Sequence, residues 1–160
     1  MGKNTHTIQG FTLIEFMIAV GLLIIVMLIT VPTLFGQRNK SQFDGTVKEI
    51  TALLREAQSK SVSQALGTTW GVHLRYDPVN VSFFALFNGT TYTGTNSAGY
   101  NRLPPGVEYI SSTLGVSNMK EILFSSLDGA TASTSFRLYM TSRPEISSTI
   151  SVASSGVVNY

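Results

Sequence analysis

Glu15 is the residue whose type and position most strongly suggest a chemical role, because no other charged residue lies between it and Arg38. An ionised carboxylate inside such an apolar run costs about 2.5 to 3.5 kcal/mol near the middle of a membrane. The run contains no cation, so the partner must be a newly made amino terminus, a lipid group or another subunit. A cut between Gly10 and Phe11 places a new ammonium group about one helical turn from this carboxylate, in its own chain or in a neighbour.

Residues for catalysis or metal binding do not form a recognisable pattern. Of the two histidines, His6 lies ahead of this cut, and His73 lies in an alternating strand pattern, where an ordinary sheet role is favoured. The chain has no cysteine, no Gly-x-Ser-x-Gly elbow, no glycine-rich phosphate loop and no acidic calcium loop. We therefore expect no enzyme, no metal site and no cofactor.

Aromatic residues in the second half are chemically suited to stacking on nucleic-acid bases. They are Phe83, Phe84, Phe87, Tyr92, Tyr100 and Tyr109. The net charge is only +2, and Lys and Arg are scattered, so the sequence gives no interleaved basic patch. We expect these rings to be sheet core or loop contacts, and DNA is a weakly supported partner.

Residues 11–35 are almost entirely apolar. As a helix, about 25 residues span roughly 37 Å, enough for a bilayer core. A secretory signal has a shorter apolar region and a small-residue cleavage site, and a plain membrane anchor leaves the polar leader and Glu15 unexplained. Pro32 predicts a helix kink. Lys3 lies on one side and Arg38 and Lys40 on the other, so the flanking charges do not decide the orientation.

The run GFTLIEFMIAV, which begins at Gly10, resembles the class III prepilin signal of type IV pilins and pseudopilins. The resemblance implies that a prepilin peptidase cuts after Gly10 on the cytoplasmic side and that Phe11 becomes N-methylated. It also implies that Glu15 acts in filament assembly, and Pro32 falls where many such pilins have a helix-kinking proline. On this reading the protein is a single-pass protein of the bacterial inner membrane, with everything after about residue 35 outside the cytoplasm, in the periplasm or on the cell surface.

An amphipathic helix is predicted in residues 36–66. Its apolar face is formed by Val47, Ile50, Leu53, Leu54 and Ala57. We favour packing of this face on the protein's own sheet over a groove for a partner. Asp44-Gly45 is a candidate interruption, Glu56 lies four residues before Lys60, and Gly67 is a candidate C-cap.

Short β-rich runs separated by turn residues follow the helix. Strands are predicted at 69–76, 79–87, 107–110, 122–125, 135–140 and 149–152, and an exposed loop at 90–102. A helix followed by strands indicates an α+β fold, with the long N-terminal helix on a mostly antiparallel sheet. The predicted layout is a leader at 1–10, a transmembrane and assembly helix at 11–35, an amphipathic helix at 36–66 and a sheet domain at 67–160.

Three segments of the second half also resemble the GspH/FimT-like pilin domain. They are LLREAQSKS from Leu53, ILFSSLDG from Ile122 and ISVASSGVV from Ile150. The resemblance implies a structural subunit of a type IV pilus, a type II secretion pseudopilus or a competence filament, with a minor or initiating subunit favoured. Its expected partners are other pilins, the prepilin peptidase and methyltransferase, and the inner membrane.

The alternative is a filament-associated protein that binds DNA, a secreted substrate or a surface through the loops of its sheet domain. Some DNA-binding relatives are thought to use basic residues near the C-terminus, but the final VVNY has none. Arg137 and Arg143 are the nearest basic residues, and we expect them on a solvated sheet edge.

Overall fold

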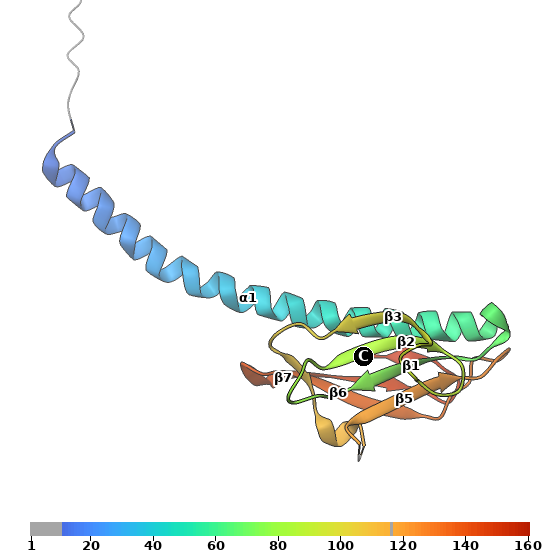
Figure 1. The fold of residues 1–160 in the computed structure, drawn as a ribbon. Coiled ribbons are helices and arrows are strands. Elements are labelled where there is room, and N and C mark those ends of the chain that lie inside the picture. Colours follow the sequence, from blue (N-terminus) through green and yellow to red (C-terminus); the bar gives the residue numbers. More distant parts are fainter. Residues whose placement is uncertain (1–10, 116) are drawn as a thin grey trace, which may run out of the picture. The chain divides into compact units, whose positions relative to one another are not determined.

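The protein divides into two compact units, Met1–Asn39 and Lys40–Tyr160, and helix α1 (Leu13–Val62) contributes to both (Figure 1). The structure, a computed structural model, describes residues 11–115 and 117–160, and it leaves the side chains of residues 28–37 undescribed. Gly10 therefore lies outside the described residues. The helical backbone of α1 passes through Pro32, but the side chain of Pro32 is not described.

The part of α1 that belongs to the second unit, from Lys40 to Val62, packs on the sheets through one apolar face. Val47, Ile50, Leu54 and Ala57 are buried at exposures of 3% or less, and Leu53 is half-buried against the same core. These are the five positions that the helical period selected, so the prediction that this face covers the protein's own sheet is confirmed.

Asp44-Gly45 does not interrupt α1. Both residues are exposed, whereas Phe43 and Val47 on either side are buried at 3% exposure. Packing of these two side chains outweighs the low helix propensity of glycine, which is about 1 kcal/mol relative to alanine.

Gly67 does not cap the α-helix, so that prediction is wrong. α1 ends at Val62, and a short 3₁₀ helix, η1 (Ala65–Gly67), follows a left-handed residue, Gln64. The Gly67 N–H donates to the Gln64 carbonyl at 2.8 Å, and the Trp70 indole N–H donates to the Ala65 carbonyl at 2.9 Å. The helix ends early because this turn is anchored by Trp70.

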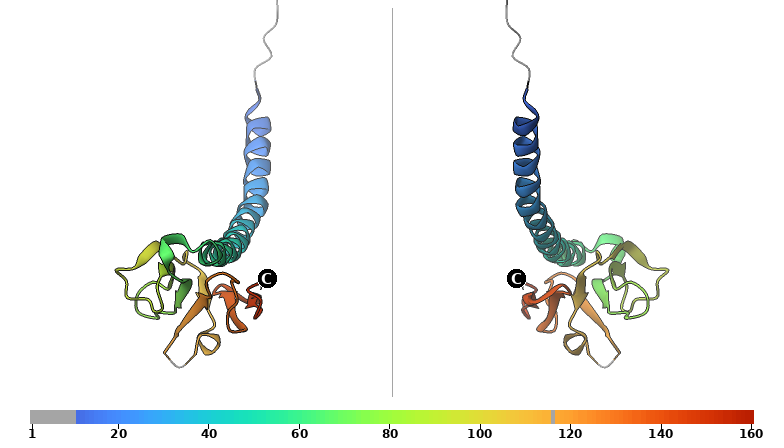
Figure 2. Two further views of the ribbon diagram at one scale, coloured as in Figure 1. Left: turned by 90° about the vertical axis from the view of Figure 1, so that its right-hand side faces the viewer. Right: turned by 90° about the vertical axis from the view of Figure 1, so that its left-hand side faces the viewer.

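Two four-stranded antiparallel sheets lie beneath this part of α1 (Figure 2). The first has the order β3-β2-β1-β5, with β1 (Trp70–Arg75), β2 (Phe83–Asn88), β3 (Ser97–Arg102) and β5 (Met119–Phe124). The second has the order β4-β6-β7-β8, with β4 (Val107–Tyr109), β6 (Thr134–Met140), β7 (Arg143–Val152) and β8 (Val158–Asn159). A second 3₁₀ helix, η2 (Ser111–Thr113), lies between β4 and β5.

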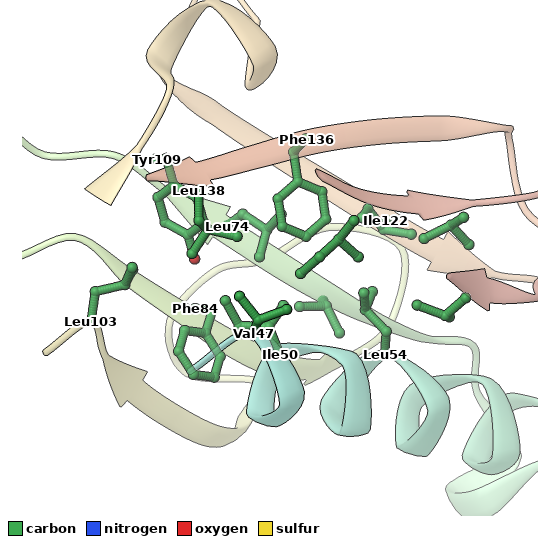
Figure 3. Close-up of a cluster of buried hydrophobic side chains, with 14 of the residues drawn as sticks. Val47, Ile50, Leu54, Leu74, Phe84, Leu103, Tyr109, Ile122, Phe136 and Leu138 are labelled. Carbon is green, nitrogen blue, oxygen red and sulfur yellow. The ribbon is translucent and has the colours of Figure 1, made fainter. Parts of the chain in front are cut away.

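The core lies between α1 and the two sheets. Figure 3 shows side chains that meet there: Val47, Ile50 and Leu54 from α1, Leu74, Phe84 and Ile122 from the first sheet, and Tyr109, Phe136 and Leu138 from the second. All are buried at 3% exposure or less. The α+β fold, with a helix packed on antiparallel strands, agrees with the sequence prediction.

The predicted exposed loop at 90–102 is wrong in its second half, because β3 occupies Ser97–Arg102 and pairs with β2. β3 lies at the edge of its sheet and alternates between half-buried and exposed residues, so it needs few apolar side chains. β2 begins later than predicted, at Phe83, because the Asp77 carboxylate accepts hydrogen bonds from the Val79 and Asn80 N–H groups and forms a turn.

Candidate assembly site and sheet surfaces

The first part of α1 exposes apolar side chains around its whole circumference. From Phe11 to Met27, every large apolar side chain is exposed, from 40% at Val20 to 78% at Leu13. A helix that is apolar on all sides is normally buried by other molecules or by the rest of its own protein. Among residues 11–115 and 117–160, no helix has an apolar stretch long enough to cross a membrane.

Glu15 lies in the first turn of α1, and Thr12 caps this turn. The Thr12 hydroxyl accepts a hydrogen bond from the Glu15 N–H at 3.4 Å, and the Thr12 carbonyl accepts one from the Phe16 N–H at 3.2 Å. The helix begins at Leu13, so Thr12 is the N-cap and Glu15 is the third helical residue. Phe11 precedes the cap and is 75% exposed.

This position gives Glu15 a favourable charge environment that does not depend on another chain. The N-terminus of a helix carries a partial positive charge, which typically stabilises a nearby carboxylate by about 0.3 to 1 kcal/mol. Our sequence reasoning missed Thr12, although the pattern Thr-x-x-Glu ahead of an apolar run is a known helix-start signature. The structure thus places Phe11 and Glu15 on the same helical start, and their roles in cleavage, methylation and assembly stay predictions.

The last turns of α1 are fastened to the sheets by Ser61. Its hydroxyl, which is fully buried, accepts a hydrogen bond from the Trp70 N–H at 2.8 Å and lies 3.0 Å from the Phe124 carbonyl, to which it donates. One side chain therefore connects the helix to the start of β1 and the end of β5.

Gln58 connects the same helix to two turns of the sheet domain, and Arg55 connects it to strand β8. The Gln58 amide nitrogen donates to the Gly129 carbonyl at 3.4 Å and to the Ser155 carbonyl at 3.3 Å, and an Arg55 guanidinium nitrogen donates to the Val158 carbonyl at 3.4 Å. The three segments that resemble the GspH/FimT-like domain thus meet at one place. Their contacts hold the helix on the sheets.

His73 is a buried residue of β1, as its strand pattern predicted, with 3% of its surface exposed. Its Nδ1 lies 3.1 Å from Glu121 Oε1, and its ring stacks on Tyr92 with 4.3 Å between centroids. Burial lowers the pKa of His73, while the hydrogen bond and the charge of Glu121 act in the opposite direction and Arg75 adds to the lowering. The imidazole is therefore neutral near pH 7 and donates from Nδ1 to Glu121.

Glu121 also accepts a hydrogen bond from the Tyr92 N–H, at 3.2 Å. Glu121 therefore ties the loop before β3 to the sheet, which indicates a structural role. Within the part of the chain that the structure describes, no three His, Asp or Glu side chains lie close enough to hold a metal ion.

Arg137 and Arg143 are both exposed: Arg137 lies in the middle of β6, opposite Thr149, and Arg143 lies at the start of β7, beside the hairpin turn. The Arg137 Nε donates to the Thr149 hydroxyl on the neighbouring strand at 2.9 Å. Because β6 and β7 are the two inner strands of this sheet, the predicted edge position is wrong, and Arg137 lies on the solvated face instead.

No protein-family model and no curated protein matches this sequence. A solved structure does match: the crystal structure of the type IV minor pilin FimU from Pseudomonas aeruginosa strain PAO1. The two chains are 14% identical, and the TM-score is 0.54 over 78% of this chain and 90% of that chain. The protein therefore has a type IV pilin-like fold.

Proposed function

We propose that this protein is a structural subunit of a type IV pilus, a type II secretion pseudopilus or a related competence filament, and that it is a minor or initiating subunit. The observation that carries the proposal is the apolar surface of the first part of α1, which the described chain leaves exposed from Phe11 to Met27. A pilin-like fold with such a helix is suited to stacking its helix among those of other subunits.

Close packing of this helix against neighbouring helices drives assembly. Because residues 11–35 lie in lipid before assembly, entry into the filament gains van der Waals contacts and ion pairing rather than removal of apolar surface from water. The partners in this proposal are other pilins or pseudopilins of the same filament.

Processing and location belong to the same proposal and rest on the sequence. A prepilin peptidase cuts after Gly10 and the new N-terminal Phe11 is methylated. Before assembly, residues 11–35 anchor the protein in the bacterial inner membrane, with its sheet domain outside the cytoplasm. The intact mass of the protein from its native host should then correspond to a chain that begins at Phe11 and carries one methyl group. A chain that retains residues 1–10 contradicts the processing step.

Glu15 is the residue that we expect to separate assembly from simple anchoring. Its carboxylate pairs with the Phe11 ammonium of an adjacent subunit, because each charge is otherwise left in an apolar helix bundle. Breaking a buried pair on one side typically costs about 3 to 5 kcal/mol.

The test compares Glu15→Val with Glu49→Val, since Glu49 is an exposed acid on the part of α1 that covers the sheets. At matched membrane levels, Glu15→Val should be cleaved normally but should lose co-purification with partner subunits and filament-dependent function. Glu49→Val should keep both. Equal co-purification of the two variants contradicts the pairing mechanism.

The alternative function, ligand binding by the sheet domain, is compatible with assembly because it uses another surface. The observation that favours it lies on the outer face of the first sheet, away from the helix.

A further inference from the structure

The register of the first sheet places two arginines on either side of one aromatic residue. Arg75 of β1 is opposite Phe83 of β2, and Phe83 is opposite Arg102 of β3. Side chains alternate along a strand, and Leu74 and Phe84 point into the core at 0% exposure. The other three side chains therefore share the outer face of the sheet, in one row across three neighbouring strands.

Aromatic rings extend this row into a wider surface. The Phe83 ring lies 4.8 Å from the ring of Tyr100, which is 48% exposed, and 6.3 Å from the ring of Tyr92. Tyr92 in turn stacks on His73. We call the surface formed by Arg75, Phe83, Tyr100 and Arg102 the arginine–tyrosine face.

Two positively charged side chains, Arg75 and Arg102, lie on this face. Both arginines are exposed, and no ion pair of either guanidinium is found among the residues that the structure describes. Three acids lie near these arginines, and each has hydrogen-bonding partners of its own. Glu121 accepts from His73 and from the Tyr92 N–H, Asp77 accepts from its own turn, and Glu108, which lines the same pocket as Arg102, accepts from the Ser82 hydroxyl. Hydrogen bonds from Asn80 and Val79 lower the pKa of Asp77, and attraction between Asp77 and Arg75 lowers it further. Because no acid lies within ion-pair distance of either arginine among the described residues, both guanidinium groups can still hydrogen-bond a ligand.

We propose that the arginine–tyrosine face binds single-stranded nucleic acid, with bases stacked on Tyr100 and Phe83 and phosphates at Arg75 and Arg102. Proteins that bind single strands combine exposed rings with cations that follow the backbone, and four-stranded antiparallel sheets with aromatics on adjacent strands are a common platform for this. The two arginines are two strands apart, or about 10 Å between Cα atoms, so the rings lie between the phosphate contacts. A duplex keeps its bases stacked internally and cannot use the rings.

The sequence alone gave no such patch, because these four residues come from three strands and only the strand register aligns them. The inference goes beyond the proposed filament role and does not depend on it. A protein that fails to assemble can still bind through this face, and the reverse also holds.

The test uses the full chain in detergent micelles and a fluorescein-labelled oligothymidylate of about 20 nucleotides, with binding followed by fluorescence anisotropy. Two phosphate contacts on a single strand predict that log K falls with log salt concentration with a slope of about −1.4, and Arg102→Gln should reduce the slope to about −0.7. Tyr100→Ala should weaken binding by about 5- to 150-fold, the equivalent of one stacked base.

Two controls match these variants. Arg137→Gln removes an exposed arginine from the second sheet, and Tyr160→Ala removes a tyrosine that is 59% exposed. Neither should change the affinity or the salt slope. The fluorescence of Trp70, which is the single tryptophan and is buried, confirms that each variant is folded.

Absence of binding at low salt overturns the proposal, and so does wild-type affinity in Tyr100→Ala. Equal affinity for duplex DNA of the same length, or an equal loss in Arg137→Gln, also overturns it, because either result indicates attraction to any polyanion. Binding of a polyglutamate peptide as tight as that of the oligonucleotide identifies the face as a site for acidic protein segments instead.

Discussion

Replacing Gly156 with alanine tests whether the end of α1 is fixed by close packing against two turns. Gly156 has φ of +82°, and a Cβ atom added to it lies 2.2 Å from the Gln58 amide nitrogen and 2.2 Å from the Gly129 carbonyl oxygen. The first neighbour is the end of a flexible side chain, but the second is backbone. Relief of the clash therefore requires the two turns to separate.

The expected loss of stability has three parts. A left-handed conformation costs alanine about 1 to 2 kcal/mol more than glycine. Displacing Gln58 removes its two long hydrogen bonds to the Gly129 and Ser155 carbonyls, worth about 0.5 kcal/mol each at the weak end of the range. Movement of the Gly129 backbone adds to this, so we expect Gly156→Ala to lower the free energy of unfolding by about 3 to 5 kcal/mol.

Gly94 provides a matched control, because it also has φ of +82° but a Cβ atom there meets nothing within 4 Å. Gly94→Ala should cost only the conformational part, about 1 to 2 kcal/mol. Urea unfolding followed by the fluorescence of the buried Trp70 measures both variants, and thermal melting should separate them by about 4 to 8 °C.

Equal destabilisation by the two substitutions refutes the packing argument, because the backbone cost is then the whole effect. Adding Gln58→Ala to Gly156→Ala sharpens the result. It should recover little of the loss, since Gln58→Ala removes the same two hydrogen bonds and the Gly129 carbonyl stays in place.

Two further predictions concern buried polar groups. The Tyr109 hydroxyl is buried and has no hydrogen-bond partner among the described residues, so Tyr109→Phe should raise the free energy of unfolding by about 1 kcal/mol in the same urea assay; a loss of stability contradicts this. Burial lowers the pKa of His73 below its ordinary value of 6.5, and the unfolded chain therefore binds a proton more readily than the folded chain. Stability should fall as the pH drops through about 6.5, and His73→Gln should flatten this part of the profile; an unchanged profile excludes His73 as its cause.

Five apolar positions on the buried face of α1 could be predicted, because burial on two sheets imposes a 3.6-residue period that the chain retains; Phe43 and Ser61, which are also buried, were missed. β3 could not be predicted. It is an edge strand with a largely polar sequence, and the same residue types are common in loops. Its pairing with β2 is a tertiary contact that no local pattern records.

The site residues divide in the same way. Glu15 could be recognised because a single charge in an apolar run is visible in one sequence. Thr12 could have been predicted as the N-cap from its position three residues before Glu15. Arg75 and Arg102 are separated by two turns and a strand, so their positions on either side of Phe83 depend on strand register. A local sequence pattern can show that one residue is unusual among its neighbours in the chain. A surface made of several strands exists only after the chain has folded.

The position of Glu15 in the first helical turn changes the energetic argument for its role. The helix terminus offsets about 0.3 to 1 kcal/mol of a cost of about 2.5 to 3.5 kcal/mol for a carboxylate in an apolar medium. Thr12 supplies the cap that fixes this turn, but it adds no positive charge. The remaining cost needs a cation, and the cleavage that we propose after Gly10 would create one on Phe11, directly before the cap. The proposed processing would therefore give the first turn both an acid and an ammonium group, which is the arrangement that two neighbouring copies of such a helix need to pair with each other.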